Sequence, residues 1–162
     1  MIRDIIRVIL KESSYGIEFI GKDDVISGDM EKWRFSSKVP YKGKDLEYII
    51  KYYGIHLGDS NRWIEVEFEV NDREYNIGSI LNGVDALRVL DTVLEGLEVV
   101  LREIEGDRII IKIVAIKGDT EDGNKRLSLY SRYINKRGIK GWEKEGMSIK
   151  GEVINIELRR VV

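Results

Sequence analysis

The chain has 162 residues, 43% of them hydrophobic and 35% charged, and its formal net charge is −2. This composition excludes an intrinsically disordered chain, and no apolar run approaches the roughly 20 residues that cross a bilayer. The absence of cysteine excludes disulfides, thiolate nucleophiles and cysteine-ligated zinc.

Length and composition predict one domain spanning residues 1–162. The first residues carry charges within an apolar stretch and lack a small-residue cleavage site, so we expect no signal peptide and a cytoplasmic location. The chain has no glutamine and many Lys, Arg and Glu, a balance typical of thermophilic proteins. Residues 107–162 hold 13 Lys/Arg against 8 Asp/Glu. A basic end on an acidic body suits a polyanionic partner or a second copy of the chain.

The N-terminal part mixes one helical pattern with short strand patterns. Apolar residues at helical spacing predict an amphipathic helix over residues 2–12, and residues 16–20 and 32–37 favour strands. Residues 45–53 are ambiguous, because apolar residues recur at i, i+3, i+4 and i+7 while the tyrosines and isoleucines also suit a strand. We favour a helix there.

The middle of the chain predicts a strand–helix–strand unit. Alternating apolar residues and glutamates predict a strand with one wet face over residues 64–70, and residues 73–80 return as its partner. Leucines at alternating steps of three and four predict a long helix over residues 84–105. Residues 108–116 are nearly all apolar and β-branched, so we expect a central strand that is covered on both faces.

The C-terminal part predicts a loop, a helix and a closing pair of strands. The loop covers residues 118–123, the second helix covers residues 124–137, and residues 147–160 form one long or two short strands.

The predicted fold class is therefore α/β (α+β), with a mixed, largely antiparallel sheet. The sheet contains one parallel βαβ unit, in which strands 73–80 and 108–116 are joined by the helix 84–105.

This order of elements resembles the core of the GNAT N-acetyltransferases. The second helix carries Asn124 and Leu129-Tyr130, and Gly138-Ile139 follows it, an arrangement similar to the last helix of that family. The same region resembles small, uncharacterised phage-encoded proteins. The resemblance implies a GNAT-like fold in residues 62–140 and an accessory protein of a virus or phage, acting in the host cytoplasm.

For chemistry, the resemblance implies acetyl-coenzyme A as a cofactor and Tyr130 as the acid that protonates the leaving thiolate. The cofactor-binding residues that it implies are Asn82, Gly83 and Asn124. The family's pyrophosphate loop is rich in glycine, whereas residues 79–86 hold one glycine, no Arg or Gln, and Asp85, whose charge repels phosphate. We therefore expect a protein that acts by binding and has no cofactor, with an N-acetyltransferase as the alternative. Tyr130 also lies on the apolar stripe of its helix, which favours a core tyrosine.

The second predicted helix has a basic face that offers another function. It carries five basic residues and no acid after residue 124. Lys125, Arg132 and Lys136 fall on one narrow face, with Tyr133 and Leu129 beside them. The candidate nucleic-acid-binding residues are these three basic residues and Arg137. A basic stripe next to an aromatic residue is typical of nucleic-acid binding. A solvated face that pairs with the acidic remainder of this chain, or of a second copy, is the simpler alternative.

Two further patterns predict no site. Glu65, Glu67 and Glu69 share a strand face and could hold a cation, but the wet face of a half-buried strand explains them, so we predict no metal. His56 is the only histidine, and nothing near it resembles a nucleophile elbow.

Overall fold

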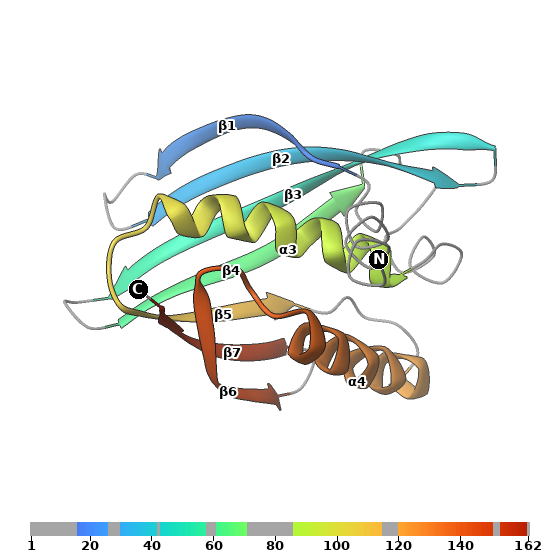
Figure 1. Cartoon of the computed structure of the whole chain (residues 1–162). Coiled ribbons are helices and arrows are strands. Elements are labelled where there is room, and N and C mark those ends of the chain that lie inside the picture. The colour runs from blue at the N-terminus through green and yellow to red at the C-terminus, as the bar shows by residue number, and fades with distance from the viewer. Residues whose placement is uncertain are drawn as a thin grey trace, which may run out of the picture.

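The computed structural model describes residues 16–25, 30–41, 43–57, 61–70, 86–114, 120–150 and 153–161. The strands are β1 (Glu18–Val25), β2 (Met30–Tyr41), β3 (Lys44–Leu57), β4 (Asn61–Val70), β5 (Arg108–Val114), β6 (Trp142–Lys150) and β7 (Val153–Arg160). Helix α3 (Ala86–Arg102) lies between β4 and β5 in the chain, and α4 (Thr120–Arg137) lies between β5 and β6 (Figure 1).

The seven described strands form one sheet in the order β1-β2-β3-β4-β5-β7-β6. Neighbouring strands are antiparallel except for β4 and β5, which are parallel. A largely antiparallel sheet with one parallel pair is what the sequence predicts, but the rest of the predicted fold needs correction.

The prediction of a balanced, GNAT-like α/β domain is wrong. The described residues are mostly strand, in a single mixed sheet, with only two helices. The excess of strand arises in the N-terminal half, where the three longest strands, β2, β3 and β4, follow one another with short connections. Such connections form an antiparallel meander and leave no length for intervening helices.

The helix predicted over residues 45–53 is wrong, because these residues belong to β3. Tyr48, Ile50 and Tyr52 are buried, while Ile49 and Lys51 between them are only half-buried. The alternation has period two, as in a strand with one buried face. The strand carries apolar residues on both faces, and by coincidence their positions also match a helical spacing.

The parallel unit also differs from the predicted one. The parallel partner of β5 is β4, with Trp63 opposite Ile110 and Ile64 opposite Ile111. Residues 73–80, which the sequence predicts as that partner, lie outside the described residues. The strand with alternating apolar residues and glutamates, predicted over residues 64–70, is therefore the parallel partner of β5.

The helix ends differ by a few residues from those predicted. Helix α3 ends at Arg102 rather than at residue 105. After it, the backbone forms i→i−3 hydrogen bonds, from Glu103 N to Val100 O and from Ile104 N to Leu101 O. Gly106 then has a φ of +114°. Helix α4 begins at Thr120, so part of the predicted loop 118–123 is helical. The closing strands are two, and the first begins earlier than predicted, at Trp142.

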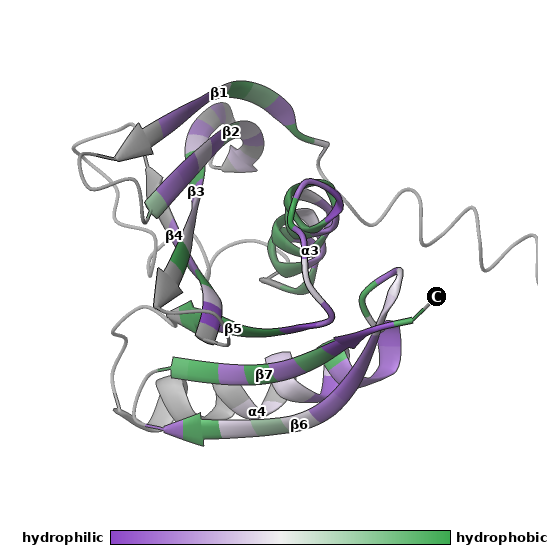
Figure 2. Ribbon diagram, turned by 90° about the vertical axis from the view of Figure 1, so that its left-hand side faces the viewer, coloured by the Kyte–Doolittle hydropathy of each residue, from purple (hydrophilic) through white to green (hydrophobic). Residues whose placement is uncertain are grey.

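Both helices cover the same face of the sheet. Alternating side chains of five neighbouring strands form the core on that face: Trp33, Phe35, Ile50, Tyr52, Ile64, Val66, Ile109, Ile111, Ile113, Ile154, Ile156 and Leu158. Helix α3 packs on them with the hydrophobic side that Figure 2 shows toward the sheet. Ile134 of α4 and Ile156 of β7 line one small cavity of about 40 Å³. Neither described helix covers the opposite face.

Helix α3 lies close to the sheet at Gly96. A Cβ atom on Gly96 would lie 2.3 Å from the hydroxyl of Tyr52, a distance that real contacts do not show. That hydroxyl donates a hydrogen bond of 2.6 Å to Val93 O, one turn earlier in the helix. Because only glycine leaves room for the tyrosine ring, this position fixes where α3 crosses β3.

An ion-pair network joins α4 to α3 beside the sheet. Arg137 donates from Nε to Asp91 Oδ1 at 2.5 Å and from a terminal nitrogen to Glu98 Oε1 at 2.7 Å. Tyr133 also donates to Asp91, at 2.7 Å. Burial by itself would lower the pKa of Arg137, but the hydrogen bond and charge of Glu98, followed by those of Asp91, raise it above its ordinary value. The network holds both helices on one side of the sheet.

The Gly96–Tyr52 contact predicts that Gly96→Ala destabilises the protein, although alanine favours a helix by about 1 kcal/mol over glycine. The added methyl group overpacks the site, which typically costs about 1–3 kcal/mol. Urea unfolding should show a net loss of about 1 kcal/mol, and a smaller loss in a Tyr52→Phe background, where the clashing hydroxyl is gone. Ser128→Ala, exposed on α4, serves as the control. A stabilised Gly96→Ala protein would contradict the contact.

Tyr52 also predicts a loss of stability in alkali. Burial, with smaller contributions from Tyr48 and Glu95, raises the pKa of Tyr52 well above 10.0. The folded state therefore keeps a proton that the unfolded state releases above about pH 10, so the free energy of unfolding falls as pH rises through that range. Tyr52→Phe should flatten this fall between about pH 9 and 11 in urea titrations, whereas Tyr53→Phe should not. Equal slopes in all three proteins would refute the assignment.

Candidate ligand-binding site on the sheet

The face of the sheet opposite α3 and α4 presents polar and aromatic side chains from the central strands. Trp63 lies opposite Ile110 and Glu65 opposite Lys112 in the parallel pair. On the other side of β5, Glu157 of β7 lies opposite Ile110. Paired residues point to one face, so these side chains form a continuous surface on β4, β5 and β7.

A cavity of about 370 Å³ lies on this surface, where β4 and β5 begin and β7 ends. We call it the Trp63 cavity. Its lining residues are Arg62, Trp63, Arg108, Ile109, Ile110, Lys112, Glu145, Glu157 and Leu158. Its volume is at the lower end of the roughly 300–1,000 Å³ that small-molecule sites occupy.

Trp63 is the aromatic wall of the cavity. The ammonium group of Lys112 lies 4.7 Å from the centre of its ring, which is the geometry of a cation–π contact. The indole nitrogen of Trp63 is buried and has no hydrogen-bond partner among the residues that the structure describes. A buried donor without a partner costs about 1–3 kcal/mol, so an acceptor brought to this nitrogen stabilises the site.

The charges of the cavity are only partly balanced. Arg108 pairs with Glu145 at 3.5 Å, and Arg159 approaches the same carboxylate at 3.6 Å. In the described part of the chain, neither Arg62 nor Lys112 forms an ion pair with a carboxylate. The lining thus carries a net positive charge next to an apolar floor, a combination that attracts organic anions.

The turn after α3 holds the edge of the cavity in place. Arg62 donates to Glu105 O, and a Cβ atom on Gly106 would lie 3.0 Å from the same guanidinium. From the other side, Arg160 donates from Nε to Gly106 O at 2.9 Å. Two arginines therefore satisfy carbonyls at the C-terminal end of α3, where a positive charge is favourable.

Of the residues that the acyltransferase resemblance implies, the structure describes the side chain of Tyr130 alone. Tyr130 is 3% exposed and belongs to the hydrophobic core, which favours its structural interpretation. Asn82 and Gly83 lie outside the described residues, and Asn124 lies in α4 with no described side chain. The strands β4 and β5 pair over four residues each and then diverge (Figure 1). The acetyl-coenzyme A hypothesis stays a prediction.

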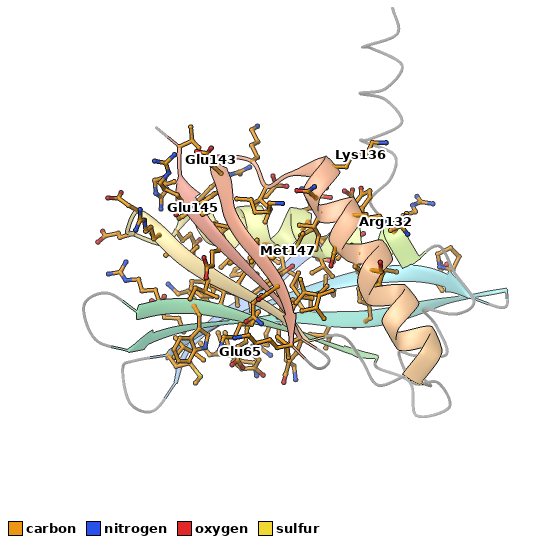
Figure 3. All side chains as sticks on the ribbon, turned by 90° about the horizontal axis from the view of Figure 1, so that it is seen from below. Glu65, Arg132, Lys136, Glu143, Glu145 and Met147 are labelled. Carbon is orange, nitrogen blue, oxygen red and sulfur yellow. The ribbon has the colours of Figure 1, made fainter. Side chains whose placement is uncertain are left out.

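The basic residues of α4 divide into two groups. Arg132 and Lys136 are exposed, four residues apart on one side of the helix (Figure 3). Arg137, by contrast, is 18% exposed and bound to two carboxylates, so it belongs to the helix contact and not to a nucleic-acid surface. Lys125 lies in the helix, but its side chain is not described.

The structure shows no metal centre in the parts of the chain that it describes. No three His, Asp or Glu side chains come together there in a group suited to a metal ion. Of the three strand glutamates, Glu65 is half-buried opposite Lys112 and Glu67 is exposed. Within the same residues, neither helix has the length and apolarity that a membrane crossing requires.

Sequence reasoning missed the Trp63 cavity because its residues come from different strands. One signal was available: Lys112 interrupts the apolar run 108–116, which we expected to be covered on both faces. Ile110 and Lys112 instead line a cavity on the face that α3 and α4 leave uncovered. A charged residue in a buried strand marks the face on which that strand meets solvent or a ligand.

Comparison with protein-family models, with curated proteins and with solved structures gives no match to this chain. Kinship with the acyltransferases and with phage-encoded proteins therefore stays a prediction.

Proposed function

We propose that this protein acts by binding a small organic anion with a planar apolar part in the Trp63 cavity. The observation that carries this proposal is Lys112, which stacks on Trp63 in an apolar-floored cavity and forms no ion pair within the described residues. A planar ligand gains contact with the indole ring, and its anionic group gains the charge of Lys112.

The strength of these contacts suits reversible binding. A cation–π contact contributes about 0.5–2 kcal/mol, and a hydrogen bond to a charged group contributes about 1.5–3 kcal/mol. A ligand that takes the place of Lys112 over the ring leaves the ammonium free to bind the ligand's anionic group. Removal of that ammonium should therefore weaken the binding of anions and leave the binding of neutral ring compounds unchanged.

A matched pair of fluorescent ligands tests the proposal. 8-Anilinonaphthalene-1-sulfonate is an anion with a planar naphthalene ring, and N-phenyl-1-naphthylamine has the same rings without the sulfonate. Lys112→Met should weaken the sulfonate about tenfold, equivalent to about 1.4 kcal/mol, and leave the neutral amine unchanged. Lys32→Met is the control, because Lys32 lies 5.5 Å over Tyr53 on the same face but outside the cavity. Near-ultraviolet circular dichroism confirms that each variant is folded.

Two outcomes contradict the proposal. The first is an absence of saturable sulfonate binding by the unmodified protein. The second is equal sulfonate affinity in Lys112→Met and Lys32→Met.

A second candidate function is supported by the surface of α4 and the turn after it. Arg132, Lys136, Lys140 and Lys144 are all exposed, and none of their charged groups forms an ion pair within the described residues. Helical rise places Arg132 and Lys136 about 6 Å apart along the axis, a spacing at which both can contact one phosphate chain. This surface supports nucleic-acid binding better than the sheet face does, because the sheet face also carries carboxylates.

Nucleic-acid binding predicts an affinity for single- and double-stranded DNA that falls steeply between about 50 and 200 mM salt. The double reversal Arg132→Glu and Lys136→Glu should abolish it, as measured by fluorescence anisotropy. Lys38→Glu with Arg102→Glu changes the net charge equally at other exposed positions and should retain most of it. If both double variants bind alike, α4 is not the interface.

A further inference from the structure

The polar groups of the Trp63 cavity are arranged around one residue, Ile110. Trp63 and Glu157 are its partners on the two neighbouring strands, so each backbone lies about 4.8 Å to one side of it. Arg108 and Lys112 lie two residues before and after it on β5, about 7 Å away on the same face. Ile110 is therefore an apolar floor, with an aromatic donor and a carboxylate across it and a cation at each end.

Glu157 is the unexplained member of this arrangement. It is exposed, and within the described residues its carboxylate forms no ion pair. A Cβ atom on Gly146 would lie 3.1 Å from Glu157 Oε2, and Gly146 follows the irregularity in the β6–β7 pairing. The glycine thus leaves room beside the cavity for the carboxylate, which forms no hydrogen bond or ion pair with any other described residue.

A ring that lies on Ile110 needs a hydrogen-bond acceptor at one edge and a hydrogen-bond donor at the other. Its edge near Trp63 lies beside a buried indole N–H that has no acceptor among the described residues. Its edge near Glu157 lies beside an exposed carboxylate that forms no ion pair among them. Simple aromatic acids offer no donor to Glu157. A nucleobase offers donors and acceptors in one plane, and a phosphate on its sugar suits Lys112 or Arg108.

We infer that the ligand of the Trp63 cavity is a nucleoside monophosphate. The ring lies on Ile110 and against Trp63, Glu157 accepts a hydrogen bond from the base, and a cation of β5 binds the phosphate. This inference rests on the proposed function, since it names the class of anion that the cavity takes.

Displacement of 8-anilinonaphthalene-1-sulfonate from the unmodified protein tests it, with AMP, adenosine, inorganic phosphate and naphthalene-1-sulfonate as competitors. AMP should compete at least tenfold more strongly than adenosine or phosphate. Glu157→Gln should weaken binding of AMP about tenfold relative to that of naphthalene-1-sulfonate. Loss of the negative charge favours both anions, but only AMP loses a charged acceptor for its base. Lys112→Met should weaken both.

The outcomes separate the two proposals. If the fluorescent sulfonate binds and AMP competes no better than adenosine or phosphate, the nucleotide inference is overturned while the anion site stands. An equal effect of Glu157→Gln on AMP and on naphthalene-1-sulfonate also overturns it. If the fluorescent sulfonate does not bind, the proposed function itself fails.

Discussion

The close approach of α3 to β3 at Gly96 and Tyr52 is the constraint on which the rest of the structure depends. The tyrosine hydroxyl bonds Val93 O, and no side chain larger than that of glycine fits above it. This contact sets the depth at which α3 lies on the sheet. It also places the helix on the face to which the side chain of Tyr52 points. The buried isoleucines of the central strands point to the same face.

Placing α3 and α4 on one face leaves the other face, among the described residues, to the strands alone. Arg137 reinforces that choice, because its two carboxylate partners lie on α3 and lose this cation if α4 moves away. On the opposite face, Trp63 and Lys112 remain half-buried among polar neighbours. The Trp63 cavity is thus a consequence of where the helices pack.

Local patterns in the sequence predicted individual elements better than their assembly. The leucine repeat located α3, and the alternation from Ile64 to Val70 located β4, because each depends on a short-range period. Which strand pairs with β5, and whether residues 45–53 form a helix or a strand, depend on contacts between segments that are distant in the sequence. A local hydrophobic period carries no information about such contacts. The cavity unites Trp63, Lys112 and Glu157 from three strands, so only the sheet register brings them together.

The most direct test of the account is the indole N–H signal of each of the three tryptophans during titration with naphthalene-1-sulfonate, observed by two-dimensional nitrogen–proton NMR. The Trp63 signal should shift in a saturable manner, because its donor lies in the proposed site. The signal of Trp33, whose indole already donates to Glu103 at 2.7 Å, should stay in place. A Trp63 signal that does not move while the ligand binds would contradict the account.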